Sequence, residues 1–216
     1  MEPRRVAIVG AGGVGKSTLL NLFRDTGWKV FPSITREFYQ LVGISDETAY
    51  MQLSTDEKVN FQRKMRMFYM KRYTEFLHDN PAMDTITDRS IFDHMAYGVY
   101  GLEKAFTPRS IQQLIDTCVA FANQSYTHLF FIPYPQPFME TASIEDGFRN
   151  TDASKNYSVS SLMLSTIYLE KIIQDKLKPE LGVVKRRDQQ PAEIFDQMQY
   201  ILLQSGRKAL LNTQEN

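Results

Sequence analysis

The chain has 216 residues, of which 43% are hydrophobic and 23% are charged, and its formal net charge is zero. This composition excludes a disordered or fibrous chain and predicts that residues 1–216 form a single globular domain. The zero net charge gives no general attraction to nucleic acid or membrane, although a local basic groove could still bind DNA. The single cysteine, Cys118, excludes a disulfide framework, and we expect a buried structural thiol there.

The first predicted element is a buried strand that leads into a glycine-rich turn. The apolar residues 6–9 precede Gly10-Ala-Gly-Gly-Val-Gly-Lys16-Ser17, which matches Gly-x4-Gly-Lys-Ser/Thr at every fixed position. In such a loop the backbone N–H groups surround phosphates, the lysine reaches the β and γ oxygens, and the serine hydroxyl binds Mg2+. The helix that follows adds the positive end of its dipole. The residues expected to bind ATP are Gly10, Gly12, Gly13, Val14, Gly15, Lys16, Ser17 and Thr18.

No apolar segment precedes this first strand, so we expect an intracellular, cytoplasmic protein without a signal peptide or a membrane span.

A second strand is predicted at residues 28–31, and a polar and aromatic segment follows it. Arg36 and Glu37 in this segment could bind a nucleotide-like acceptor while the ring of Tyr39 stacks on its base. The alternative is a surface ion pair beside two core aromatic residues.

A capping-box spacing at Ser54-Thr-Asp-Glu57 predicts the start of a long helix. Apolar residues then recur at helical spacing, and we interpret this stripe as core packing. One edge of the stripe could form the floor of a substrate pocket. The stripe consists of Phe61, Met65, Phe68, Tyr69, Tyr73, Phe76 and Leu77.

The next predicted strand, residues 83–87, ends at Asp88. The carboxyl ends of parallel strands form the ligand-binding edge of an α/β sheet. A carboxylate there can hold Mg2+ or accept the proton of an attacking hydroxyl. Asp88 could instead cap the following helix, a role for which Ser90 competes.

The remaining pattern predicts helices at 91–100, 107–122, 162–177 and 191–203 and strands at 129–132 and 182–185. Strands that alternate with helices predict an α/β fold of the P-loop NTPase class, with a parallel five-stranded sheet and helices on both faces. Residues 135–158 are rich in proline and polar side chains and predict a mobile lid. Its Asp146-Gly-Phe-Arg149 segment could bring Arg149 over a transferring phosphoryl group and place Asp146 at the substrate.

Four features occur in the order phosphate loop, Arg36-Glu37, Asp88-Arg89-Ser90 and Asp146-Gly-Phe-Arg149. In these the chain resembles the P-loop kinases of the nicotinamide-riboside-kinase-like ATPase family and, more distantly, deoxynucleoside and thymidylate kinases. The resemblance implies that Asp88 is a general base, Arg89 a phosphate-side electrophile and Arg149 a lid arginine. It also implies a nucleoside or nucleotide as acceptor.

The predicted function is therefore ATP- and Mg2+-dependent transfer of the γ-phosphoryl group to a nucleoside- or nucleotide-type acceptor. One alternative is the chemistry of phage-encoded kinases of similar type, which phosphorylate 5-hydroxymethyluracil bases in DNA and would make DNA a partner. Another is a nucleotide-dependent regulatory switch. Against a GTPase switch, the chain has no Asn-Lys-x-Asp motif.

Overall fold

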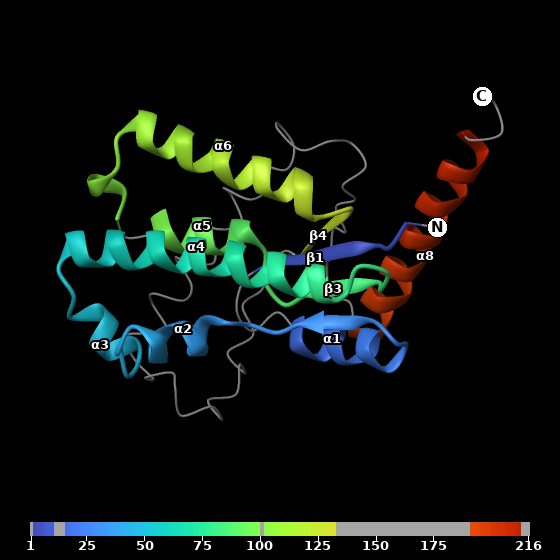
Figure 1. Ribbon diagram of the computed structural model, residues 1–216, viewed down its shortest axis with the longest axis horizontal. Helices are drawn as coiled ribbons and strands as arrows, with labels where there is room; N and C mark the ends of the chain where they lie inside the picture. Colours follow the sequence, from blue (N-terminus) through green and yellow to red (C-terminus); the bar gives the residue numbers. More distant parts are fainter. Residues whose placement is uncertain (1, 11–15, 100–101, 133–190, 213–216) are drawn as a thin grey trace.

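The computed structural model describes residues 2–10, 16–99, 102–132 and 191–212, and Figure 1 shows their arrangement. The centre is a parallel sheet of strands β1 (Arg5–Gly10), β2 (Lys29–Phe31), β3 (Thr85–Thr87) and β4 (His128–Ile132). The strand order is β2-β3-β1-β4. Ala7 is in register with both Thr87 and Leu129, so β1 lies between β3 and β4. The predicted strand at 182–185, the helix at 162–177 and the lid at 135–158 lie outside the described residues.

The side chains of β1 alternate between two hydrophobic cores, as a strand buried on both faces requires. Ala7 and Val9 pack in the core under helices α4 (Thr55–Asp79), α5 (Ile91–Val99) and α6 (Pro108–Ser125). Val6 and Ile8 pack in the opposite core under α1 (Lys16–Asp25) and α8 (Pro191–Asn212). Helices therefore cover both faces of the sheet, which confirms the predicted fold class.

The long helix α4 begins at the predicted capping box. The hydroxyl of Ser54 accepts a hydrogen bond from the Glu57 backbone N–H, and the Glu57 carboxylate accepts one from the Ser54 backbone N–H. Phe61, Met65, Tyr69 and Tyr73 of the predicted stripe are buried. A second capping box at Thr107 starts α6 at the predicted position.

Two short helices were not predicted, α2 (Thr35–Leu41) and α3 (Glu47–Met51). Figure 1 shows both beside the N-terminal half of α4. They form a third core there in which Phe38 and Tyr50 pack on Phe61. The 3-10 helix η1 (Glu103–Ala105) also contacts α4.

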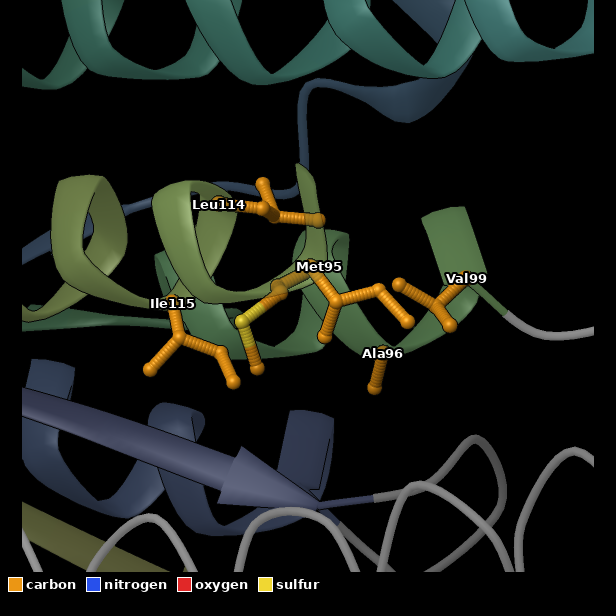
Figure 2. A pocket seen from close by; sticks show the side chains of 6 residues that line it. Met95, Ala96, Val99, Leu114 and Ile115 are labelled. Atoms are coloured by element: carbon orange, nitrogen blue, oxygen red, sulfur yellow. The ribbon is translucent and has the colours of Figure 1, made fainter. Parts of the chain in front are cut away.

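The contact between α5 and α6 is apolar, as Figure 2 shows. Met95, Ala96 and Val99 face Ile111, Leu114 and Ile115 around a cavity of about 10 Å3. This volume is at the limit for one water molecule, and the apolar lining offers it no hydrogen bonds, so the cavity as it stands is too small for a nucleoside or nucleotide. Cys118 is buried, as expected, and its burial raises the pKa of the thiol to about 12.

No helix in the described ranges is long and apolar enough to cross a membrane.

Candidate active site

The phosphate-loop lysine is the first residue of α1, the helix that follows β1 in the chain. β1 ends at Gly10 and α1 begins at Lys16, while Gly12, Gly13, Val14 and Gly15 lie outside the described residues. Lys16 is buried, with 5% of its surface exposed, whereas Ser17 and Thr18 are exposed in the first turn of α1. This turn contains no acidic side chain that would neutralise the positive end of the helix dipole. The start of α1 can therefore bind an anion.

Asp88 lies at the carboxyl edge of the sheet, on the neighbouring strand. Thr87 is in register with Ala7, so Asp88 follows β3 while β1 continues to Gly10. The Asp88 backbone N–H donates to the Phe31 carbonyl at 3.2 Å, which fixes the start of the turn. The half-buried Asp88 carboxylate makes no hydrogen bond or salt bridge with any residue that the structure describes.

Ser90, and not Asp88, caps helix α5. The Ser90 hydroxyl accepts from the backbone N–H of Phe92 at 3.0 Å and of Asp93 at 3.3 Å. In return, the Asp93 carboxylate accepts from the Ser90 backbone N–H at 2.7 Å. The Ile91 N–H donates to the Tyr126 hydroxyl at 3.3 Å. The backbone N–H groups at the N-terminus of α5 thus have hydrogen-bond partners within the protein, so α5 does not need the Asp88 carboxylate as its cap.

The guanidinium of Arg89 lies over the ring of Tyr97, 5.2 Å from its centroid. Burial lowers the pKa of Arg89, but Tyr97, Asp93 and Asp88 more than offset this and raise it above the usual arginine value. Its Nη1 atom is shielded from solvent and has no hydrogen-bond partner among the described residues. Arg89 is therefore a permanent cation with unused donor capacity next to Asp88.

His94, on the next turn of α5, is held neutral. Burial and the nearby cations Arg89 and Arg66 lower its pKa to about 3. Its ring packs against Tyr69, with the centroids 4.7 Å apart.

Two polar residues of α4, Gln62 and Arg66, lie against α5, and the sequence analysis did not identify them. A Cβ atom added to Gly98 would come within 2.5 Å of the Arg66 Nη1 atom and 3.5 Å of the Gln62 Cβ atom. Gln62 donates a hydrogen bond to the Tyr50 hydroxyl at 2.9 Å. Both residues share the helix face of Tyr69 and interrupt its apolar stripe, which is the signal that could have marked them.

The predicted acceptor-binding residues Arg36, Glu37 and Tyr39 all lie on α2. Arg36 and Glu37 are exposed, and Glu37 forms a salt bridge of 3.3 Å with Arg72 of α4. The Tyr39 ring packs edge-on against Phe61, with the centroids 5.1 Å apart. The alternative of an ion pair beside core aromatic residues thus describes Glu37 and Tyr39, and their role in acceptor binding stays a prediction. Asp146 and Arg149 lie outside the described residues.

The described part of the chain contains no cluster of three or more His, Cys, Asp or Glu side chains that could hold a metal ion. Ser17 and Asp88 offer a hydroxyl and a carboxylate oxygen. Such oxygen donors suit Mg2+, which keeps several waters and binds through few protein ligands together with phosphates. A larger cavity of about 260 Å3 lies between α4 and α6, and neither Lys16 nor Asp88 lines it.

Comparison with solved structures supports the same fold. Thymidylate kinase from Ehrlichia chaffeensis aligns with a TM-score of 0.56 and 13% identity, and the alignment covers 94% of this chain and 100% of that kinase. A deoxyadenosine kinase from M. mycoides, solved with dCMP and dCDP, aligns with a TM-score of 0.56 and 14% identity over 92% and 98% of the two chains. NadR in complex with NR aligns with a TM-score of 0.51 and 17% identity over 85% of this chain and 45% of NadR.

Among curated proteins, no sequence matches this chain. A family model, in contrast, matches residues 5–170, from β1 through the region that follows β4. That family is described as an AAA domain. The resemblance inferred from the motifs to nicotinamide-riboside-kinase-like, deoxynucleoside and thymidylate kinases is confirmed at the level of the fold. The chain therefore belongs to the AAA domain family and has the fold of the nucleoside and nucleotide kinases.

Proposed function

We propose that the protein transfers the γ-phosphoryl group of ATP to a nucleoside- or nucleotide-type acceptor. The observation that carries this proposal is the arrangement at the edge of the sheet. A buried lysine at the start of α1 and a carboxylate that forms no hydrogen bond or salt bridge within the described ranges follow neighbouring parallel strands. A structural carboxylate in this position would cap α5, but Ser90 has that role.

Each residue in this arrangement has a chemical role. Lys16 and the first turn of α1 would bind the β and γ phosphates. Asp88 would accept the proton of an acceptor hydroxyl, and Arg89 would stabilise charge on the transferring group. Arg149 is proposed to add a second cation to the transferring group, as the resemblance implies. Catalysis then consists of positioning and charge stabilisation.

Ser17 and Asp88 would hold Mg2+, because this ion binds through few protein oxygen atoms together with phosphate and water. When bound, the ion neutralises charge on the phosphate oxygens. If Asp88 serves the metal, it is not available as the base, and the two roles can be separated by mutation.

The proposed acceptor class is supported by the fold and by the polar and aromatic side chains along α4. The structural neighbours carry the names of thymidylate and deoxyadenosine kinases. In this chain, Gln62 and Arg66 of α4 lie against Gly98 of α5, and Phe38 of α2 and Tyr50 of α3 pack on Phe61 of α4. Amide, guanidinium and aromatic groups are those that recognise a base and a sugar phosphate.

The test is transfer of label from γ-labelled ATP to a panel of nucleosides, nucleoside monophosphates, nicotinamide riboside and DNA that contains 5-hydroxymethyluracil. Label in one of these acceptors, lost in Lys16→Ala, is the expected result. Label only in inorganic phosphate, at a rate that no acceptor changes, would reject the kinase and support the regulatory switch.

A further inference from the structure

A chain of hydrogen bonds from two buried tyrosines spans the turn that carries Asp88 and Arg89. The Tyr69 hydroxyl donates to the Arg89 carbonyl at 2.6 Å. The Tyr69 and Tyr126 hydroxyls lie 2.8 Å apart, and the Ile91 backbone N–H donates to the Tyr126 hydroxyl at 3.3 Å. Tyr69 belongs to α4 and Tyr126 follows α6, so two helices far apart in the sequence meet at this turn.

The direction of each bond follows from the groups at the two ends. A carbonyl can only accept and a backbone N–H can only donate. Tyr69 therefore gives its single proton to Arg89, and Tyr126 must give its own proton to Tyr69. The chain runs from the Ile91 N–H through Tyr126 and Tyr69 to the Arg89 carbonyl, and bonds aligned in this way strengthen one another. Burial raises the pKa of both tyrosines well above the usual value, so both hydroxyls keep their protons.

Other bonds fix the turn on either side of this chain. The Thr87 hydroxyl donates a second hydrogen bond to the Arg89 carbonyl at 2.7 Å. The Asp88 N–H is bonded to Phe31 of β2, and the Ser90 N–H is bonded to Asp93 of α5. The backbone from Asp88 to Ile91 is thus held at successive peptide groups, and this fixes the points from which the Asp88 and Arg89 side chains project.

We propose that Tyr69 and Tyr126 are positioning residues for phosphoryl transfer, because their hydroxyl pair orients the turn that presents Asp88 and Arg89. This inference rests on the proposed function, since it assigns the reacting groups to that turn. Both tyrosines are buried and their hydroxyls bond to protein groups, so both act through the backbone. A displacement of about 1 Å in a catalytic group can cost about 100-fold in rate, which is why a buried hydroxyl pair can control the reaction.

Tyr73 provides a matched control. It lies one turn after Tyr69 on α4, is fully buried, and its ring is stacked on that of Tyr69 with an interplanar angle of 7°. Its hydroxyl interacts with the Thr85 side chain and makes no hydrogen bond to the turn from Asp88 to Ile91. Tyr73→Phe and Tyr69→Phe therefore remove the same buried atom from adjacent rings, but only Tyr69→Phe breaks the bond to Arg89.

The kinetic experiment measures kcat and KM for the acceptor identified with the labelled panel, per nucleotide-binding site. We expect Tyr69→Phe to lower kcat by about 10- to 100-fold, with KM for ATP changed by less than about 3-fold. Tyr73→Phe should keep kcat within about 2-fold of wild type. The double variant Tyr69→Phe/Tyr126→Phe should lose little more than Tyr69→Phe, because both changes break one chain. Unchanged kcat in Tyr69→Phe, or an equal loss in Tyr73→Phe, would overturn the proposal.

A second measurement does not depend on transfer. Amide exchange of Ile91, followed by NMR without ligand, should accelerate in Tyr69→Phe and Tyr126→Phe but not in Tyr73→Phe. If wild type labels no acceptor, the proposed function fails while this exchange pattern still reports on the hydroxyl pair. If wild type labels an acceptor and the exchange of Ile91 is the same in all variants, the hydroxyl pair does not hold the turn and the inference fails alone.

Discussion

Asp88→Asn removes the charge of the candidate catalytic carboxylate and preserves its shape. The Asp88 side chain makes no hydrogen bond or salt bridge with the described residues, and Ser90 caps α5 in its place. The substitution should therefore lower the free energy of unfolding by no more than about 1 kcal/mol, because α5 keeps its cap and Arg89 keeps Asp93 and Tyr97 beside it. If Asp88 is the general base, the chemical step should slow by about 10^2- to 10^4-fold, which corresponds to about 3–5 kcal/mol of activation free energy.

The assay is single-turnover transfer from saturating ATP over a range of Mg2+ concentrations. Asp79→Asn makes the same chemical change on an exposed side chain at the end of α4 and should have no effect. A large loss in Asp88→Asn that Mg2+ cannot restore supports the base and an acceptor hydroxyl. A partial recovery at high Mg2+ indicates a metal ligand. A small loss at saturating Mg2+ would refute the base and indicate a monophosphate acceptor, whose attacking oxygen is already ionised.

Three further changes test the site. Lys16→Ala should abolish transfer, because the lysine binds the phosphates. Its thermal unfolding should stay close to that of wild type, because the lysine does not hold the core together. Retained turnover in a folded variant would contradict this assignment. Ser90→Ala should destabilise the protein by about 1–2 kcal/mol in denaturant unfolding, since α5 loses its cap, and a change below about 0.3 kcal/mol would show that the cap is unimportant. His94 has a pKa lowered to about 3, so its neutral form stabilises the fold above pH 6.5, and this contribution is lost as the pH falls from 6.5 towards 3. Between pH 7 and 5, the free energy of unfolding of wild type should fall by about 2 kcal/mol more than that of His94→Gln. Equal pH dependence in the two proteins would show that His94 titrates normally.

The parts of the fold that local chemistry determines were predictable from the sequence. Ser54 and Thr107 start helices through side-chain bonds to their own first turns, so the capping pattern is sufficient. The strand before Gly10 and the helix from Lys16 follow from the phosphate-loop motif. Helices α2 and α3 were missed because their few residues carry little periodicity and depend on packing against α4.

The candidate site was predictable only in part. Sequence reasoning left the cap of α5 open between Asp88 and Ser90, although Ser90 and Asp93 have the capping-box spacing that α5 uses. The pairing of Tyr69 with Tyr126 joins residues 57 positions apart, and no local pattern encodes such a contact. Gln62 and Arg66 lie in an otherwise apolar stripe, where the chemical reason for a polar side chain depends on the neighbouring helix.

The stoichiometry of the reaction tests the central claim most directly. ADP release and transfer of label to the acceptor are measured together in one reaction, with and without the acceptor. A phosphotransferase should release one ADP for each labelled acceptor molecule, and ADP release should fall strongly when the acceptor is omitted. ADP that accumulates at the same rate without any labelled acceptor would contradict the account and identify the chain as an ATP-hydrolysing regulator.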